Sequence, residues 1–408
     1  MILHKRMAAF AAMGFVMAAG AHAQEAEVMH WWTSEGESKA VAVFADAYGD
    51  AGGVWVDSAI AGGPAARQAA ITRIVAGDPP TANQFNTSRE FEDLVEQGLL
   101  ADLGEYADTE QWKSVMPESL VETASRDGKF YALPINIHGR SWIFYNADVL
   151  EEVGAEPPQG WGDDMFAALD KVKAAGKVPL ALSGTPVYEL MVFHSIMLDR
   201  GGADLWYGAY RDRNEEVLEG DAMRETFETF ARLRDYVDPG SPGRLWNAAT
   251  NMVITGDAAF TSVGDWAKAE FLAAGMTPGE EFGCILPGGV LSIGGDVFVF
   301  PVQKDEDAKA AQALLVEVMS DPQVLKDFNL VKGSIPPRSD IDMSDTDVCT
   351  QIGSKALQSA DTRLPRMSML VPGTVEGEVQ DLVSEFWNDP SMTVDEAMER
   401  HAEIVINN

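Results

Sequence analysis

The sequence has little of the side-chain chemistry that catalysis and metal binding most often use. Six histidines occur in 408 residues, and none stands near another histidine or a cysteine at the spacing of a zinc site. The chain has no G-x-S-x-G motif, no P-loop and no G-x-G-x-x-G motif. These absences argue against a zinc enzyme, a serine hydrolase and a nucleotide-binding enzyme. We therefore expect no catalytic residues, no metal and no organic cofactor.

One pair of acids keeps an enzymatic alternative open. Glu35 and Glu37 could in principle act as the two carboxylates of a glycosidase. They lie in one turn, however, where they are too close and too flexible for the opposed carboxylates that glycoside hydrolysis requires. A carbohydrate-active enzyme thus remains the alternative to a binding protein.

Basic residues are also scarce. The chain has 30 Lys and Arg against 64 Asp and Glu, for a net charge of −34. Such a surface repels nucleic acid and anionic membrane, so we expect no nucleic-acid partner. The charge keeps the chain soluble and says nothing about its fold.

The first 23 residues have the pattern of an export signal. Lys5 and Arg6 precede an apolar stretch at 7–20, and Ala21-His22-Ala23 has the form of a cleavage site. The apolar stretch is shorter than the roughly 20 residues that a membrane-spanning helix needs, and no later stretch is long enough. No cysteine follows at the start of the mature chain to carry a lipid. We expect a signal peptide at 1–23 and a periplasmic protein beginning at Gln24.

Only two cysteines occur, Cys284 and Cys349. An even number in an oxidising compartment permits a disulfide, which would close a long loop and contribute about 4 kcal/mol in the chain-entropy model. Two buried free thiols are equally compatible with the sequence, because it does not show whether the two side chains meet.

Strand-like and helix-like segments alternate along the chain. Residues 28–32 and 54–56 have the pattern of buried strands, and 38–48 and 65–76 that of helices. Such alternation is typical of an α/β fold with helices on both faces of a parallel or mixed sheet. The length exceeds what one hydrophobic core supports and predicts more than one domain. An extended run at 128–146 is long enough to pass between domains.

Adjacent tryptophans stand at the end of the first predicted strand. Trp31 and Trp32 precede a polar turn that contains Glu35 and Glu37. Ligands of open α/β sheets bind beyond the carboxyl ends of the strands. Aromatic rings that stack on sugar C–H faces, next to carboxylates that accept hydroxyl hydrogen bonds, would form a sugar site. The alternative is that one or both rings fill the core.

Longer motifs give the sequence a specific resemblance. They are Val-Met-His-Trp-Trp-Thr-Ser-Glu-Gly-Glu at 28–37, Gly-Lys-Phe-Tyr-Ala-Leu-Pro-Ile-Asn-Ile-His at 128–138, Gly-Asp-Trp at 264–266, Gly-Gly-Asp at 294–296 and Lys-Gly-Ser-Ile-Pro-Pro-Arg at 332–338. With these motifs, which extend over nearly the whole chain after residue 23, the sequence resembles the glucose-binding proteins of ABC importers. Those proteins are part of the larger family of extracellular solute-binding proteins that includes the maltose-binding type.

The resemblance implies a set of ligand-binding residues. Trp31 and Trp32 would form one wall of the site, with Trp32 the better candidate for stacking. The second lobe would supply an opposite wall. Asp296 and Lys332 would provide a charged pair near the crossovers between the lobes. The remaining implied ligand-binding residues are Glu37, Gln84, Trp246 and Trp266, and Arg67 and His138 lie in matching motifs beside them.

Two positions depart from the glucose-specific pattern. Asn86 stands where glucose-specific relatives usually have a basic residue, and we include it in the predicted site. The segment 364–370 lacks the histidine that they usually carry. These departures leave another hexose, a pentose, a polyol or a small glycoside compatible with the sequence.

The resemblance implies a class II, maltose-binding-protein-like fold with two α/β lobes and three hinge crossovers. We expect residues 24–135 and 297–335 in the first lobe and 136–296 and 336–408 in the second. A monomer would close around a sugar such as glucose or a related hexose and present it to an inner-membrane ABC permease. A sensor that reports to a chemoreceptor is a further alternative.

Overall fold

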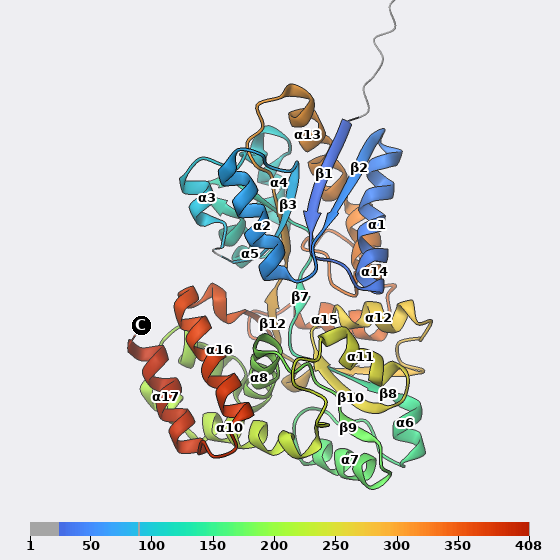
Figure 1. The fold of residues 1–408 in the computed structure, drawn as a ribbon, viewed down its shortest axis with the longest axis vertical. Coiled ribbons are helices and arrows are strands. Elements are labelled where there is room, and N and C mark those ends of the chain that lie inside the picture. The colour runs from blue at the N-terminus through green and yellow to red at the C-terminus, as the bar shows by residue number, and fades with distance from the viewer. Residues whose placement is uncertain (1–23, 89, 408) are drawn as a thin grey trace, which may run out of the picture.

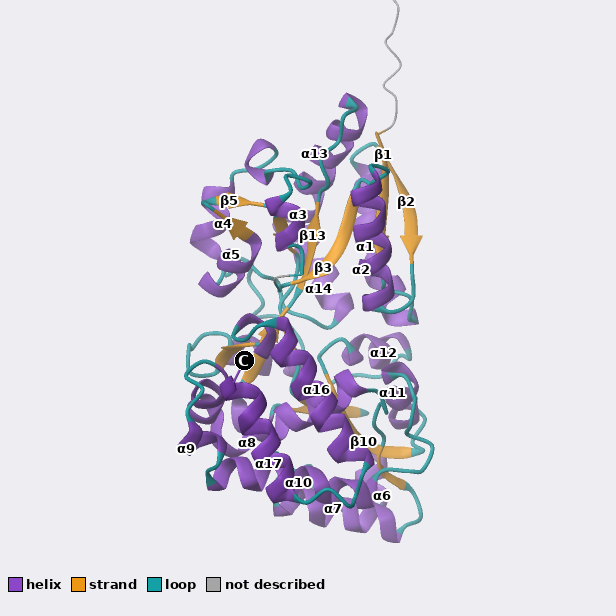
Figure 2. Ribbon diagram, turned by 60° about the vertical axis from the view of Figure 1, so that its left-hand side comes forward, coloured by secondary structure: helices purple, strands orange, loops and turns teal. Residues whose placement is uncertain are grey.

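The computed structural model describes residues 24–88 and 90–407, which form two lobes joined by a narrow waist (Figure 1). The predicted signal peptide at 1–23 lies outside the described residues. Both lobes combine helices with strands, so the predicted α/β, two-lobed fold class is confirmed. Helices cover the outside of both lobes (Figure 2).

The first lobe is built on a five-stranded mixed sheet in the order β2-β1-β3-β13-β6. The strand β1 is parallel to β2 and β3, whereas β13 is antiparallel to β3 and β6. A separate small hairpin pairs β4 with β5. The strand bounds are β1 Gln24–His30, β2 Gly53–Ala59, β3 Ala82–Asn86, β4 Ser125–Arg126, β5 Lys129–Phe130, β6 Ala132–Pro134 and β13 Asp296–Val299.

Local sequence signals set the ends of the helices in this lobe. At the start of α1, Ser34 and Glu37 form a capping box, in which each side chain bonds the other residue's backbone N–H. Gly77 ends α2 in the left-handed conformation, with φ of 78°. The helix bounds are α1 Glu35–Asp50, α2 Gly63–Ala76, α3 Glu92–Glu96, α4 Thr109–Val115, α5 Glu118–Ala124, α13 Glu306–Ser320 and α14 Pro322–Lys332.

The second lobe contains a four-stranded sheet in the order β11-β8-β10-β9 and a larger share of helix. Its strands are β8 Trp142–Asn146, β9 Val178–Leu180, β10 Ala258–Val263 and β11 Phe282–Ile285. Its helices are α6 Ala147–Glu152, α7 Asp163–Ala174, α8 Pro186–Tyr210, α9 Glu215–Leu218, α10 Asp221–Leu233, α11 Trp246–Ile254, α12 Ala267–Ala273, α15 Val348–Ala356, α16 Gly373–Asn388 and α17 Val394–Asn407. Short 3-10 turns occupy Leu103–Glu105, Arg234–Tyr236, Pro287–Gly289 and Met367–Met369.

Three crossovers lie side by side at the waist. Gly294 of β12 (Leu291–Gly294) pairs with His138 of β7 (His138–Gly139), and β14 (Arg363–Pro365) completes this small sheet. Ile137 and Ile335 exchange backbone hydrogen bonds of 2.6 and 3.1 Å. The three passages therefore brace one another, which limits the ways in which the lobes can move.

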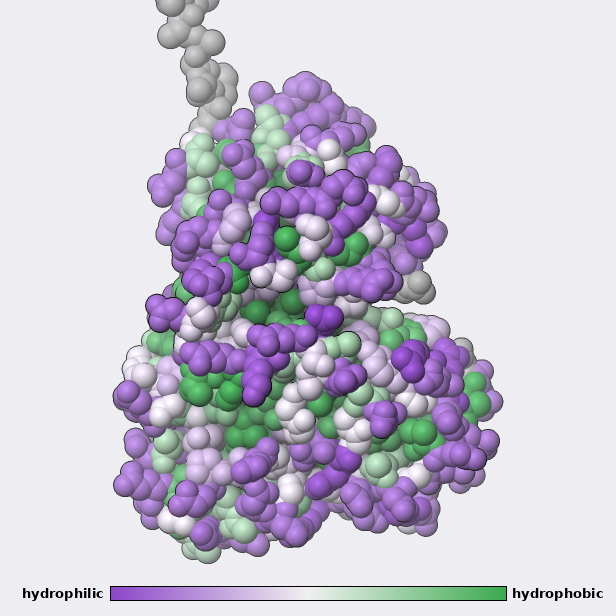
Figure 3. Space-filling view, turned by 180° about the vertical axis from the view of Figure 1, so that it is seen from behind, coloured by the Kyte–Doolittle hydropathy of each residue, from purple (hydrophilic) through white to green (hydrophobic). Residues whose placement is uncertain are grey.

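The apolar side chains separate into cores on either side of this waist. One core draws on residues 26–135 and 297–328. The other two draw on residues 137–293 and 335–405, with Leu120 as the one member from elsewhere. The surface is largely hydrophilic and is indented between the lobes (Figure 3). Among the residues that the structure describes, no helix is long and apolar enough to cross a membrane.

The predicted elements recur with shifted ends. The strand predicted at 54–56 lies within β2, and the helix predicted at 65–76 is part of α2, which begins two residues earlier. The strand predicted at 28–32 begins at Gln24 and ends at His30, so Trp31 and Trp32 lie just beyond it. The extended run at 128–146 is divided among β5 to β8 by the passage between the lobes.

A disulfide joins Cys284 of β11 to Cys349 of α15, across a sequence separation of 65 residues. The loop that it closes leaves the second lobe, traverses β13, α13 and α14, and returns. The bond therefore fastens the returning chain to the lobe it left. The sequence was compatible with either a disulfide or two free thiols, and the structure contains the disulfide.

Removing this bond tests its role in stability. We expect Cys284→Ala with Cys349→Ala to lower the free energy of unfolding by about 2–4 kcal/mol, because the unfolded chain regains the entropy of an open loop. Urea denaturation followed by circular dichroism measures the loss. A double variant as stable as the parent, or a parent unaffected by reductant, would contradict it.

Candidate functional site

The two adjacent tryptophans point in different directions. The ring of Trp32 is only 1% exposed and packs against Phe298 and Phe328, with ring centroids 5.8 and 5.4 Å away. Both neighbours belong to the first lobe, so Trp32 is a core residue there. The interpretation of Trp32 as the better stacking candidate needs correction, because neighbouring residues of an extended chain face opposite sides and Trp32 takes the inner one.

Trp31 is the partly exposed member of the pair. The Arg67 guanidinium lies over its ring, 5.5 Å from the centroid. Its backbone N–H donates to Gln84 Oε1 at 3.0 Å, which fixes the loop against β3. Trp31 thus offers an aromatic face backed by a cation.

The Asp296 carboxylate lies at the centre of a buried polar network. Oδ1 accepts hydrogen bonds from Gln84 Nε2 at 3.0 Å and from Asn86 Nδ2 at 3.3 Å. Oδ2 accepts from Asn136 Nδ2 at 2.9 Å and contacts His138 Nε2 at 3.0 Å. Three predicted site residues, Gln84, Asn86 and Asp296, therefore meet directly at the waist.

A histidine continues this network into the second lobe. His138 lies between two carboxylates, with Nε2 facing Asp296 and Nδ1 facing Asp265. Burial disfavours the charged imidazole most strongly, but the charge and hydrogen bonds of Asp265 and then Asp296 outweigh it and raise the pKa of His138. Burial likewise opposes ionisation of Asp296, and His138 with Lys332 still holds the pKa of Asp296 below its usual value.

Two predicted site residues of the first lobe, Glu37 and Lys332, form an ion pair. Lys332 Nζ lies 3.4 Å from Glu37 Oε1, and both side chains are buried. Glu37 also accepts from the Ser34 hydroxyl at 3.1 Å, as part of the capping box. The resemblance paired Lys332 with Asp296. In the structure its hydrogen-bond partner is Glu37, while its charge still acts on Asp296.

The second lobe contributes an aromatic cluster around Trp266. The ring of Trp246 lies 6.4 Å from it, and that of His138 lies 5.2 Å from it, both edge to face. Tyr188, on α8, is a third neighbour at 6.4 Å. Burial raises the pKa of Tyr188, and the charge of Glu37 on the other lobe adds to this effect. Tyr188 therefore lies close enough to the first lobe for the charge of Glu37 to act on it.

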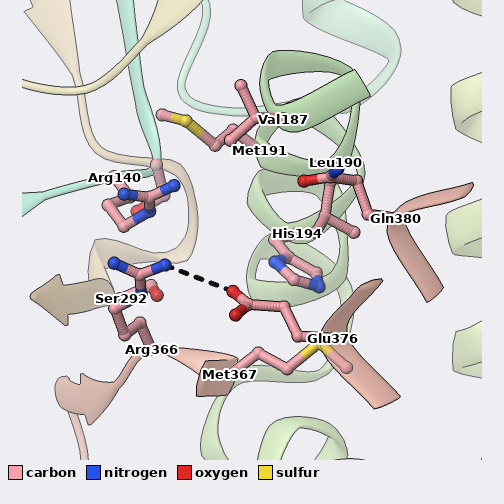
Figure 4. Close-up of a pocket in the computed structure, with 11 residues that line it drawn as sticks. Arg140, Val187, Leu190, Met191, His194, Ser292, Arg366, Met367, Glu376 and Gln380 are labelled. Carbon is pink, nitrogen blue, oxygen red and sulfur yellow. Dashed lines mark hydrogen bonds and ion pairs between the residues drawn. The ribbon is translucent and has the colours of Figure 1, made fainter. Parts of the chain in front are cut away.

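Three polar residues of this region were missing from the predicted set: Tyr188, Arg140 and Arg366. Arg140 follows the His138 motif by two positions, and Arg366 stands in the segment 364–370, where the usual histidine is absent. Both line a small pocket of the second lobe (Figure 4). The departure at 364–370 was the signal for Arg366. Nothing local in the sequence marked Tyr188, which lies in the first turn of an apolar helix.

The arrangement can hold a polar ring with apolar faces. Aromatic rings of both lobes provide surfaces for C–H faces, and amides, carboxylates and cations provide donors and acceptors between them. In the part of the chain that the structure describes, no group of three or more His, Cys, Asp or Glu side chains is placed to hold a metal ion.

Comparison with known proteins assigns the family. Residues 39–349 match the model for bacterial extracellular solute-binding proteins. A Mesorhizobium japonicum protein named "Probable sugar-binding periplasmic protein" is 37% identical over 95% of each chain. A protein of the same name from Brucella melitensis is 35% identical over 91% of this chain and 90% of its own. The chain belongs to the bacterial extracellular solute-binding protein family.

Solved structures share the fold at low sequence identity. A "Chitin oligosaccharide binding protein" has a TM-score of 0.77 at 17% identity and covers 94% of this chain and 98% of its own. The "Thermus thermophilus maltotriose binding protein bound with maltotriose" has a TM-score of 0.72 at 16% identity, covering 94% and 99%. These likenesses confirm the two-lobed fold.

Mutation of each tryptophan in turn can separate its effect on stability from its effect on ligand binding. Trp32→Ala should destabilise the protein by about 3–5 kcal/mol, because it empties a packed aromatic core. Trp31→Ala should change stability by less than about 1 kcal/mol, because its ring is partly exposed, and should weaken saccharide binding about tenfold or more. Chemical denaturation and calorimetric titration measure the two effects. Equal losses of stability in both variants would refute this division of roles.

The His138 network predicts a dependence of stability on pH. Because the pKa of His138 is raised above its unfolded value of 6.5, its contribution is fully present below pH 6.5 and is lost as pH rises through the folded pKa. His138→Gln should remove this component and cost about 3 kcal/mol at pH 6, since it unbalances two buried carboxylates. Urea denaturation at pH 5.5 to 8.5 tests it. Parallel pH profiles for parent and variant would rule it out.

Proposed function

We propose that this protein is the periplasmic component of an ABC importer and captures a sugar of monosaccharide size, such as glucose or a related hexose. The observation that carries the proposal is the polar network of Asp296, which bonds Gln84 and Asn86. Gln84 holds the backbone of Trp31 in one lobe, and His138, which contacts Asp296, packs against Trp266 of the other. Stacking surfaces beside charge-assisted hydrogen-bond partners suit a pyranose ring.

The relatives support a sugar without agreeing on its size. Besides the two proteins named for sugar binding, a Haloferax volcanii relative at 25% identity is a "Xylose/arabinose-binding protein". The solved structures include both a receptor described as preferring "b-D-galactopyranose" and a "SBP RafE in complex with raffinose". We favour a monosaccharide because Asp296 and its amide partners already contact one another directly, which leaves a compact site.

Closure of the lobes around the ligand would create the surface that an inner-membrane permease recognises. Two contacts at α1 and α12 support this. The backbone N–H of Gly36 donates to Glu270 Oε1 at 3.1 Å, and a Cβ at Gly36 would lie 2.7 Å from that of Ala269. Only glycine allows the lobes to approach so closely here. We propose lobe boundaries at residues 135, 296 and 335, where the apolar cores separate.

We further propose that the protein is a monomer in the periplasm. It neither makes nor breaks a covalent bond in its ligand, and it has no nucleic-acid partner. Its acid-rich composition supports the last point. The resemblance placed Arg67 and His138 beside the ligand-binding residues. We propose that Arg67 orients Trp31 and that His138 orients Asp296.

Thermal unfolding in the presence of a saccharide panel tests the function. A sugar that binds only the folded state adds about 2.7 kcal/mol of stability at one hundred times its Kd. We expect a pentose, hexose or hexose derivative to raise the melting temperature and amino acids to leave it unchanged. A response to amino acids or peptides alone would overturn the proposal, and steady hydrolysis of a glycoside would favour the enzymatic alternative.

A further inference from the structure

Two arginines share one small pocket in the second lobe. Arg140, just past the first crossover, and Arg366, just after β14, lie on the same wall of the pocket, and α8 and α16 form the other side (Figure 4). The pocket is small and has a cavity volume of about 20 Å³, which suits a group of the size of a water molecule or a carboxylate. Ser141, Ser292 and Gln380 add polar groups to its lining.

The guanidinium groups of Arg366 and Arg140 differ in whether a carboxylate is bonded to them. Arg366 Nη2 bonds Glu376 Oε1 at 3.2 Å. The Arg140 guanidinium, by contrast, has no hydrogen-bond or ion-pair partner anywhere in residues 24–88 and 90–407, although its backbone N–H is bonded. A half-buried cation without an acceptor is costly to fold, and it is kept where something else completes its hydrogen bonds.

The pocket therefore carries one positive charge in excess. Arg140 and Arg366 contribute two, and Glu376 removes one. His194, on the facing helix, adds none, because burial and then the charge of Arg140 lower its pKa well below 6.5. Burial, followed by the repulsion of Arg366, lowers the pKa of Arg140 to about 10, so Arg140 is still protonated at neutral pH.

The unbalanced cation borders the aromatic cluster of the sugar site. The Arg140 guanidinium lies over the Trp266 ring, 6.0 Å from its centroid. The first lobe adds Arg67, which lies over Trp31 and is already bonded to Asn86 and paired with Glu90 at 2.9 Å. The free guanidinium thus lies directly beside the aromatic wall of the second lobe.

We propose that the ligand is an acidic sugar whose carboxylate enters the Arg140–Arg366 pocket while its ring lies between the aromatic residues of the two lobes. This inference rests on the proposed function and narrows its ligand class. The planar guanidinium of Arg140 matches a carboxylate with two parallel hydrogen bonds. One excess positive charge balances one carboxylate and leaves a dianionic phosphate under-compensated.

A neutral hexose would leave the excess positive charge at Arg140 without a counterpart. Its hydroxyls can accept from Arg140, but they do not neutralise a guanidinium that a second guanidinium already repels. The chain has more than twice as many acids as bases, yet no carboxylate of the described residues lies within ion-pair distance of Arg140, and Glu376 in the same pocket bonds Arg366. A monoanionic ligand completes the pocket's charge and its hydrogen bonds together.

Calorimetric titration with matched sugars tests the proposal. The probes are glucuronate, galacturonate and gluconate, their neutral parents glucose and galactose, and glucose 6-phosphate. We expect at least one of the carboxylates to bind at least tenfold more tightly than its neutral parent, and 0.5 M salt to weaken that preference. Preference for the phosphate, or for a neutral sugar, would overturn the acidic-sugar inference and leave the proposed function intact. Binding of no saccharide would instead count against the proposed function itself.

Substitution of Arg140 locates the preference in the pocket. Arg140→Met keeps the unbranched stem and removes the charge. It should weaken binding of the carboxylate about 10- to 100-fold, and by at least tenfold more than it weakens binding of the neutral parent. Its melting temperature without ligand should not fall, because an unbalanced cation is lost. Arg211→Gln, an exposed charge removal in the same lobe, is the matched control and should change neither affinity. Equal weakening of both sugars by Arg140→Met would contradict recognition of the carboxylate.

Discussion

The carboxylate of Asp296 is the interaction on which the arrangement of this protein depends. It stands at the first residue of β13, where the chain returns from the second lobe to the first. Its two oxygens hold Gln84, Asn86, Asn136 and His138, which come from β3 and from the first crossover. A buried carboxylate is tolerated because every side of it meets a donor. The same bonds that make its burial possible join the waist to the predicted site.

This network has consequences for both halves of the molecule. Through His138 it reaches Asp265 and the Trp266 turn, so the position of one lobe's aromatic wall depends on the other lobe's carboxylate. Any ligand that bonds Gln84 or Asn86 would share these amides with Asp296. Ligand binding would therefore be coupled to the geometry of the crossovers without a separate transmitting element.

Charge is distributed in two ways in this chain. The chain is rich in acids, whereas Arg67, Arg140, Arg366 and Lys332 lie beside residues of the predicted site or line the small pocket of the second lobe. Three of these cations have carboxylate partners, and Arg140 has none among residues 24–88 and 90–407. Recognition of a ring by aromatic faces and of its substituent by a guanidinium are separable functions, so the same fold can accept neutral or acidic sugars by changing a few pocket residues.

Much of the local structure could be predicted from the sequence, because it depends on neighbouring residues. Apolar spacing identified α1 and α2, and the motif at 28–37 placed two tryptophans at the end of the first strand. Neighbouring residues did not decide which tryptophan faces the core.

The tertiary structure alone decided the contacts between distant segments. It buried Trp32 between Phe298 and Phe328, joined Cys284 to Cys349, and paired Lys332 with Glu37 in place of Asp296. It also brought Arg140 and Arg366 into one pocket, across more than half the length of the chain. Sequence determines side-chain chemistry and local periodicity. Partners in space follow only from how the two lobes and their three crossovers pack, because such contacts join residues that no local pattern relates.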